Sequence, residues 1–292
     1  MTESLAYSNL NRRRRSWVSL STSFVCVAAA FLASVFVWLL SDLVSGGIAS
    51  LSWDFLSTPP LNAGREGGIG PVVFSTILIL FVAVAASLPI SLGTAVLLAE
   101  FSRRNSPFAA FVRLSLDVLA GVPSIVFGLF GNAFFCIYLE LGFSILSGGL
   151  TLACMVMPIL IRTAEEGLRS VPDGYRLAAA ALGISRSAAL VHLLLPVAMP
   201  SLIAGLMLGI GRAAAETAAL IFTSGYVDRM PGSLFDSGRA LSVHIYDLAM
   251  NVAGGDHNAR AAALVLVLLL FVINGIATML AGRWRNVRVA AA

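Results

Sequence analysis

The chain has 292 residues, of which 58% are hydrophobic and 12% are charged, and its formal net charge is +4. A mean hydropathy of +0.91 predicts a polytopic membrane protein, because each run of about 20 apolar residues can cross a bilayer of roughly 30 Å. All 19 basic residues are arginine. The absence of lysine excludes a P-loop lysine, a Schiff-base lysine and the lysine-based serine hydrolases. The chain itself therefore cannot hydrolyse ATP by the usual P-loop route.

The N-terminal part of the chain combines a polar tail with a long apolar run. Residues 1–16 are polar and end in four consecutive arginines, at positions 12 to 15. The apolar run over residues 17–43 is too long for a signal peptide, so we expect a retained first transmembrane helix. Residues 44–69 are rich in glycine, serine and proline and predict an outer loop.

Five further membrane spans are expected, at residues 70–99, 122–141, 143–163, 188–222 and 260–281. Residues 106–120 carry apolar side chains at helical spacing, which predicts a helix that lies at the membrane surface or leads into the next span. We therefore expect an all-α membrane protein with six transmembrane helices, a core over residues 70–282 and a C-terminal tail at 283–292. A polar elbow at 164–187 separates the fourth and fifth spans.

Six spans place both termini on the same side of the membrane, and the distribution of arginine indicates which side this is. The arginines of the tails, of the second-to-third connection and of the elbow all lie in segments assigned to one side. Only Arg65, Arg229, Arg239 and Arg260 fall in segments assigned to the other side. Because cytoplasmic loops are enriched in arginine, both termini are predicted to be cytoplasmic.

The elbow reads as a short helix with defined ends. A serine cap at Ser170 and an early proline at Pro172 predict a helix start, Gly183 ends that helix, and Ser185 can cap the next one. The alanine-rich face between them is small and apolar and would favour a partner groove. From the pattern alone, two interpretations of the elbow are equally favoured. It is either a helix that docks on a partner or a cytoplasmic loop that packs on its own bundle.

A resemblance distinguishes between these two interpretations of the elbow. The spacing of Ala178-Ala179, Gly183 and Leu193-Leu194-Leu195-Pro196 resembles the EAA loop of ABC-importer permeases. In that family the loop is a coupling helix that docks on a separate ATPase subunit. The resemblance implies a coupling helix at 173–186, with the contact residues Arg176, Leu177, Ala178, Ala179, Gly183 and Pro196.

The match to the EAA loop has one departure. Leu177 stands where the family motif has a glutamate. Any contact that the family makes through that carboxylate would need another acidic residue here, and Glu165, Glu166 and Asp173 are the candidates nearby.

Further blocks are similar to the phosphate-specific permeases, at residues 67–71, 119–130, 148–152, 158–163 and 211–217. Residues 243–252, followed by Gly254-Gly255-Asp256, resemble the PstA family in particular. The resemblance covers about residues 65–283 and implies a type I importer permease of the MetI-like fold, which forms half of a translocation path for phosphate in a bacterial inner membrane. It also implies two copies of the ATPase PstB, a second permease PstC and a periplasmic or tethered phosphate-binding protein PstS. ATP and Mg would bind to the ATPase, and no cofactor to this chain.

Arg212 and Glu216 lie four residues apart in the fifth span, a spacing that would place them on one helix face. An arginine inside a span costs about 2.5–3.5 kcal/mol on insertion scales, and Glu216 would offset part of this cost. Because a guanidinium can bind two oxygens of a phosphate, we expect Arg212 on the translocation path, with Glu216 holding or neutralising it. The alternative is an interhelical ion pair that fixes the interface between the two permeases.

Lesser candidates for the path are the hydroxyl residues Ser75, Thr76, Ser124 and Thr217. They could instead ease helix packing through their small size. In the longest outer loop, the spacing of His244, Asp247, Asp256 and His257 fits no standard metal site, so a solvated face is expected. Cys26, Cys136 and Cys154 are interpreted as small apolar fillers. We expect no catalytic residues and no metal site.

Two other functions stay open. A permease of the same class could carry another oxyanion, such as molybdate or phosphonate. A secondary transporter is less favoured, because no internal inverted repeat is evident and the elbow would then be unexplained.

Overall fold

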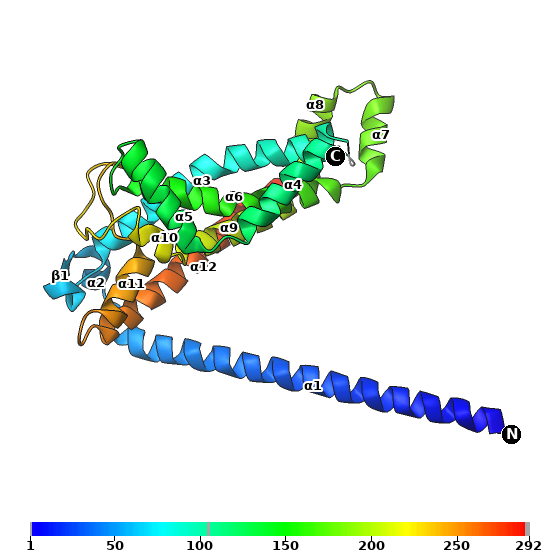
Figure 1. The fold of residues 1–292 in the computed structure, drawn as a ribbon, viewed down its shortest axis with the longest axis horizontal. Coiled ribbons are helices and arrows are strands. Elements are labelled where there is room, and N and C mark those ends of the chain that lie inside the picture. The colour runs from blue at the N-terminus through cyan, green and yellow to red at the C-terminus, as the bar shows by residue number, and fades with distance from the viewer. Residues whose placement is uncertain (1, 104–105, 290–292) are drawn as a thin grey trace.

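The structure is a computed structural model that describes residues 2–103 and 106–289, and the side chains of residues 22–103 and 106–279. It is almost entirely helical (Figure 1). Five helical segments are long and apolar enough to cross a membrane: Thr22–Ser50, Gly70–Phe101, Ile145–Arg169, Arg186–Ala214 and Asp256–Met279. A sixth crossing is possible if one bent helix pair forms a single span. The expected all-α membrane architecture is therefore confirmed.

The first helix, α1 (Thr2–Gly47), meets the body of the molecule near its C-terminal end. There Gly47 packs so tightly on α12 (Asp256–Val289) that a Cβ at this position would lie 2.9 Å from the Arg260 carbonyl oxygen. Figure 1 shows the rest of α1 running away from the body. Its described apolar side chains are therefore mostly exposed.

Short elements order the segment that was expected to be an outer loop. They are η1 (Ile48–Ser50), α2 (Trp53–Ser57), β1 (Pro60–Leu61), η2 (Asn62–Gly64) and β2 (Glu66–Gly67). The side chain of Ser52 caps α2 by accepting a hydrogen bond from the Phe55 N–H at 3.1 Å. The two strands pair antiparallel, with Pro60 opposite Gly67.

The centre of the body is α6 (Ile145–Arg169), which packs between α3 (Gly70–Val96) and α9 (Leu195–Ala214). A Cβ at Gly149 of α6 would lie 2.6 Å from the Val82 Cβ, and a Cβ at Gly205 of α9 would collide with the Thr163 side chain. Only glycine permits these close helix approaches. The main apolar core lies along this seam and includes Ile79, Leu152, Val156 and Leu160.

The region of the third expected span is a bent helix pair. It consists of α4 (Pro107–Ala120), α5 (Ser124–Gly131) and the π-helix η4 (Asn132–Tyr138), with a bend of 99° between α4 and the α5–η4 segment. Residues 124–138 give a helix of about 22 Å, too short for a hydrocarbon core of roughly 30 Å. A sixth crossing is present if α4 and the α5–η4 segment together form one span. The expected span over 122–141 corresponds to the α5–η4 segment, and the helix expected over 106–120 corresponds to α4. The break falls at Pro123, which has no N–H to donate and disfavours a helical conformation at Val122.

The elbow consists of α7 (Asp173–Ala181) and the start of a second helix, which runs through α8 (Arg186–Ala189), η5 (Leu190–Leu194) and α9. Gly183 has a φ of +68° and ends α7, and Ser185 caps α8 by accepting from the Ala188 N–H at 3.3 Å. The expected Ser170 cap is wrong, because the Ser170 hydroxyl donates back to the Gly167 carbonyl and the N-cap of α7 is Pro172.

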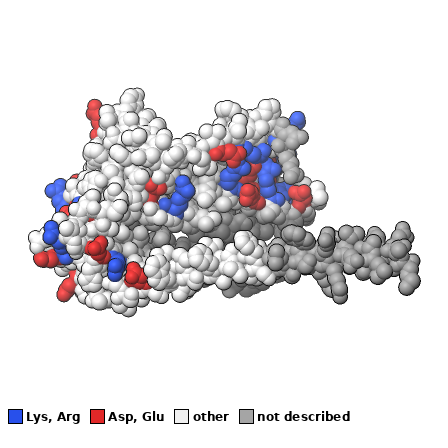
Figure 2. All heavy atoms as spheres, turned by 60° about the horizontal axis from the view of Figure 1, so that its bottom comes forward, with Lys and Arg blue, Asp and Glu red and all other residues white. Residues whose placement is uncertain are grey.

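The fifth span is shorter than the expected 188–222. Its helix ends at Ala214, and the short helix α10 (Ala218–Ile221) follows after a break. A long loop then leads to α11 (Leu241–Met250), which packs on α12. Figure 1 shows the elbow and this outer region at opposite ends of the body. Figure 2 shows charged side chains gathered at both ends, with mostly uncharged surface between them.

Candidate functional site

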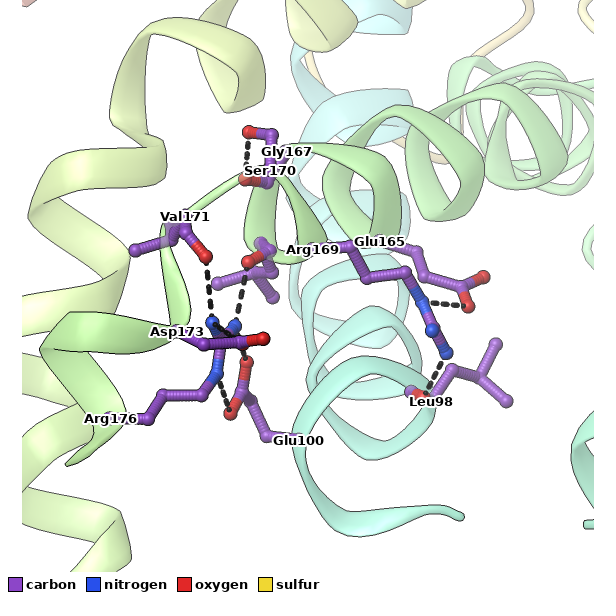
Figure 3. A network of polar contacts seen from close by, with 10 residues as sticks. Leu98, Glu100, Glu165, Gly167, Arg169, Ser170, Val171, Asp173 and Arg176 are labelled. Carbon is purple, nitrogen blue, oxygen red and sulfur yellow. Dashed lines mark hydrogen bonds and ion pairs between the residues drawn. The ribbon is translucent and has the colours of Figure 1, made fainter. Parts of the chain in front are cut away.

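Arg176 anchors the elbow helix α7 to the rest of the chain (Figure 3). Its Nη2 and Nε donate to the two carboxylate oxygens of Glu100, at 2.6 Å and 3.2 Å. The same guanidinium donates to the carbonyls of Val171 and Leu168, at 2.7 Å and 2.9 Å. The hydrogen bonds to Glu100 raise the pKa of Arg176 above its ordinary value. Arg176 is thus engaged in contacts within its own chain, where the sequence had suggested a contact with a partner.

The two faces of α7 differ in exposure. Ala179 is buried against the body, whereas Leu177 is 70% exposed and Leu182 just beyond the helix is 76% exposed. Ala178 and Gly183 are also exposed. Pro196 lies half-buried near the start of α9, away from this face. Of the residues expected to contact a partner, only Leu177, Ala178 and Gly183 are freely presented by the elbow, and Leu182 joins them.

A second polar cluster lies behind the elbow and centres on Glu165 of α6, which is 4% exposed. Its Oε1 accepts from the Nε of Arg113 in α4 and from the Nε of Arg169 in α6, both at 2.9 Å. Arg169 also donates to the Leu98 carbonyl at 2.9 Å, in the π-helical turn η3 (Leu97–Phe101) that ends the second span. Glu165 therefore joins α4 to α6, and Arg169 extends the contact to α3.

Deeper in the bundle, a cavity of about 230 Å³ lies between α4, α5, α6 and α9. It contains two arginines, Arg162 and Arg212, and one carboxylate, Asp117. Arg162 donates to Asp117 and, at 3.2 Å, to the Arg113 carbonyl. Arg212 is exposed in the isolated chain and forms no hydrogen bond or ion pair with any residue that the structure describes. The cavity thus holds one arginine that a carboxylate neutralises and one that is free to bind an anion.

The expected pairing of Arg212 with Glu216 is wrong. Because α9 ends at Ala214, Glu216 lies outside the helix that carries Arg212. Its Oε1 accepts from the Ala219 N–H at 3.4 Å, and its carbonyl accepts from the Ser242 hydroxyl at 2.6 Å. These contacts hold Glu216 at the start of α10 and beside α11.

The sequence did not identify Arg162 or Asp117 as site residues. Arg162 lies in one of the phosphate-permease-like blocks, 158–163. It was interpreted there only as one of the many arginines in segments assigned to the cytoplasmic side. Asp117 lies on α4, 45 residues away in the chain. Only the packing of α4 on α6 brings the two side chains together.

The four hydroxyl residues do not line this cavity. Ser75 and Thr76 are buried in α3, where Thr76 donates to the Val72 carbonyl and accepts from the Leu241 N–H at 2.8 Å. Thr76 thus fixes the start of α11 on α3. Ser124 begins α5 and Thr217 precedes α10, both half-buried.

The histidine of α11 is buried, so the expectation of a solvated face is wrong for His244. Its side chain is 0% exposed, and the Arg239 Nη1 lies 3.3 Å from its Nδ1. Burial, assisted by the charge of Arg239, lowers the pKa of His244 to about 4. Asp247 lies 3.5 Å from the Arg239 Nη1, while His257 contacts Ser50 elsewhere. Among the described residues, no group of three or more His, Cys, Asp or Glu side chains could hold a metal ion.

Residues 87–286 match the family of binding-protein-dependent transport system inner membrane components, and the chain belongs to this family. It is therefore a multi-pass bacterial membrane protein and a transport subunit rather than an enzyme. It is 33% identical to the probable ABC transporter permease protein YqgI of Bacillus subtilis, over 91% of this chain and 93% of that protein. It is also 33% identical to the phosphate transport system permease protein PstA of Mycobacterium leprae, over 90% of this chain and 88% of that protein. The PstA of Xylella fastidiosa is 32% identical, over 76% of this chain and 77% of that protein.

The fold agrees with this family. A chain of the MetNI methionine ABC transporter, in an inward-facing conformation, superposes with a TM-score of 0.59 over 74% of this chain and 95% of that one, at 19% identity. A second crystal form of MetNI gives a TM-score of 0.56. The expected MetI-like permease fold is therefore confirmed.

Proposed function

We propose that this chain is the transmembrane permease subunit of an ATP-driven phosphate importer. The observation that carries the proposal is the unpaired Arg212, which lines a cavity within the bundle together with Arg162. An unneutralised guanidinium among membrane helices is costly, and an anionic cargo that it binds bidentately gives a reason to keep it. The relatives named as phosphate permeases support phosphate as that cargo.

In this proposal Arg212 is the primary anion contact of the path and Arg162 a second contact whose charge is balanced by Asp117. Glu216 does not hold Arg212. The alternative role for Arg212 is a contact that fixes the interface with the second permease. The path is supported by the position of Arg212 on the same cavity as Arg162.

The elbow supplies the coupling. The exposed side chains Leu177, Ala178 and Leu182 form a small apolar surface at the end of a short helix, which suits a shallow groove on a partner. We assign that partner as the ATPase PstB in two copies, with ATP and Mg bound there. The remaining subunits would be a second permease, PstC, and a periplasmic or tethered binding protein, PstS. Both termini and the elbow would face the cytoplasm, as the arginine distribution favours.

The decisive experiment is uptake of radiolabelled phosphate into vesicles that contain the reconstituted complex, with and without this chain. Sulfate and molybdate serve as competitors. We expect uptake that requires both ATP and this chain and that neither competitor reduces. Uptake of molybdate or phosphonate instead would assign another oxyanion, and uptake without ATP would assign a secondary transporter.

A further inference from the structure

The arginines and carboxylates of the inner half of the bundle form one connected network. It begins at α7, where Asp173 and Glu100 bind Arg176, and passes to the end of α6 through the hydrogen bond from Arg176 to the Leu168 carbonyl. It continues through Arg169 and Glu165 to Arg113 of α4. The Arg113 carbonyl accepts a hydrogen bond from Arg162, which also binds Asp117. The network ends at these two side chains, which line the cavity.

Three side chains of this network share one stripe of α6. Arg162, Glu165 and Arg169 are spaced by three and four residues, so they lie above one another on the same helix face. The outer two face different neighbours. Arg169 contacts the end of the second span through the Leu98 carbonyl, and Arg162 contacts α4 through Asp117. Glu165 lies between them and is the buried carboxylate on which arginines of two helices converge.

From this arrangement we infer that Glu165 is a positioning residue, which couples the position of the elbow helix α7 to the arginines of the cavity. The inference rests on the proposed function of the elbow and the cavity. A displacement of α7 pulls on Glu100 and on the end of α6 through Arg176. Glu165 transmits that displacement to α4, because its bond to Arg113 holds α4 against α6. Asp117 and Arg162 then move together relative to Arg212 of α9, which changes the arrangement of charges around an anion in the cavity.

The physical basis is the buried charge of Glu165. Its carboxylate attracts two guanidinium groups that approach the same oxygen and balances one of their two charges, and low exposure makes that attraction strong. Replacing it with glutamine keeps the shape but leaves Arg113 and Arg169 close together without a counter-charge. The contact between α4 and α6 then loosens at the point where the elbow and the cavity are joined.

The test compares phosphate uptake with ATP hydrolysis in the reconstituted complex carrying Glu165→Gln. We expect phosphate uptake per ATP hydrolysed to fall by about tenfold, a typical size for a coupling between two sites, while ATP hydrolysis changes by less than about twofold. The matched control is Glu166→Gln, which removes the neighbouring exposed carboxylate that forms no ion pair within the described residues. That variant should keep the wild-type ratio within about twofold.

A double variant separates coupling from charge balance. Arg113→Gln combined with Glu165→Gln removes a cation and an anion together, so the net charge of the cluster stays the same but the bond between α4 and α6 is lost. A low ratio of phosphate uptake to ATP hydrolysis in the double variant supports the inference. This holds even if the Glu165→Gln variant fails to assemble. A ratio restored to the wild-type value overturns it, because Glu165 would then act only by neutralising charge. A parallel loss of uptake and hydrolysis in both variants also overturns it.

Failure of the proposed function gives a different result. If the wild-type complex carries another oxyanion and no phosphate, the assignment of cargo fails. The ratio of uptake to hydrolysis, measured with that oxyanion, then still tests Glu165.

Discussion

Arg176 and Glu100, which lie 76 residues apart in the chain, form a paired contact in which two guanidinium nitrogens meet the two carboxylate oxygens. The side chain of Glu100 is 13% exposed and that of Arg176 is 27% exposed, so the pair is shielded from water on most sides. The contact fastens α7 to the end of the second span. We therefore expect α7 and the end of the second span to move together.

Removing the carboxylate of this pair should loosen the elbow. In Glu100→Gln the guanidinium loses its charged acceptor, and we expect α7 to lose about 2 kcal/mol of local stability, as is typical for a hydrogen bond to a charged group. Faster hydrogen exchange of the α7 amides would measure this change. The control is Asp173→Asn, because the Asp173 side chain is 91% exposed and contributes little. Equal exchange rates in the two variants would contradict the anchoring role.

Replacing Arg212 tests the cavity. We expect Arg212→Gln to reduce phosphate uptake by at least about tenfold, because it removes a charged, bidentate contact to the anion, while the purified complex keeps its subunits. Arg229→Gln is the control, since Arg229 is exposed in the outer loop and has no partner among the described residues. Loss of subunits from the Arg212→Gln complex would favour the interface role.

Two glycines of the elbow both have open space around them and differ in backbone conformation. Gly183 has a φ of +68°, and a Cβ added there would meet no atom within 4 Å, so Gly183→Ala costs only the conformational penalty, about 1–2 kcal/mol. Gly174, within α7, also has open space but no positive φ. Gly174→Ala should stabilise α7 by up to about 1 kcal/mol. Hydrogen exchange of α7 should move in opposite directions in the two variants, and slower exchange in Gly183→Ala would contradict the prediction.

The outer end should be destabilised by acid through His244. Its pKa of about 4 in the folded protein lies below the ordinary 6.5, so the unfolded chain binds a proton at a pH where the folded chain does not. Stability contributed by neutral His244 is present above pH 6.5 and is lost as the pH falls towards 4, by about 3 kcal/mol in total.

The measurement is the free energy of unfolding of the outer region between pH 7 and 4, followed by hydrogen exchange of the α11 amides. The His244→Gln variant is expected to be less stable at pH 7 but to lose less stability on acidification. Tyr246→Phe, an exposed change on the same helix, should keep the wild-type pH dependence. An unchanged slope in His244→Gln would show that another group titrates.

The sequence by itself determined the membrane class, the approximate positions of the long helices and the elbow with its Gly183 end. These follow from local properties, because an apolar run of sufficient length and a glycine or proline at a helix end act through their nearest neighbours. The EAA-like spacing and the phosphate-permease-like blocks also pointed correctly to an importer permease. Local pattern could not predict the 99° bend between α4 and the α5–η4 segment, because that angle depends on how both pack on α6.

Only the tertiary structure decided which charges meet. Four-residue spacing suggested that Glu216 pairs with Arg212, but the Ser242 hydroxyl and the end of α9 hold Glu216 elsewhere. Packing instead brings Asp117 to Arg162 and Glu100 to Arg176, across 45 and 76 residues. An arginine inside a bundle binds whichever acceptor the helix packing places within reach of its long side chain. That choice depends on contacts between distant segments, which no local spacing encodes.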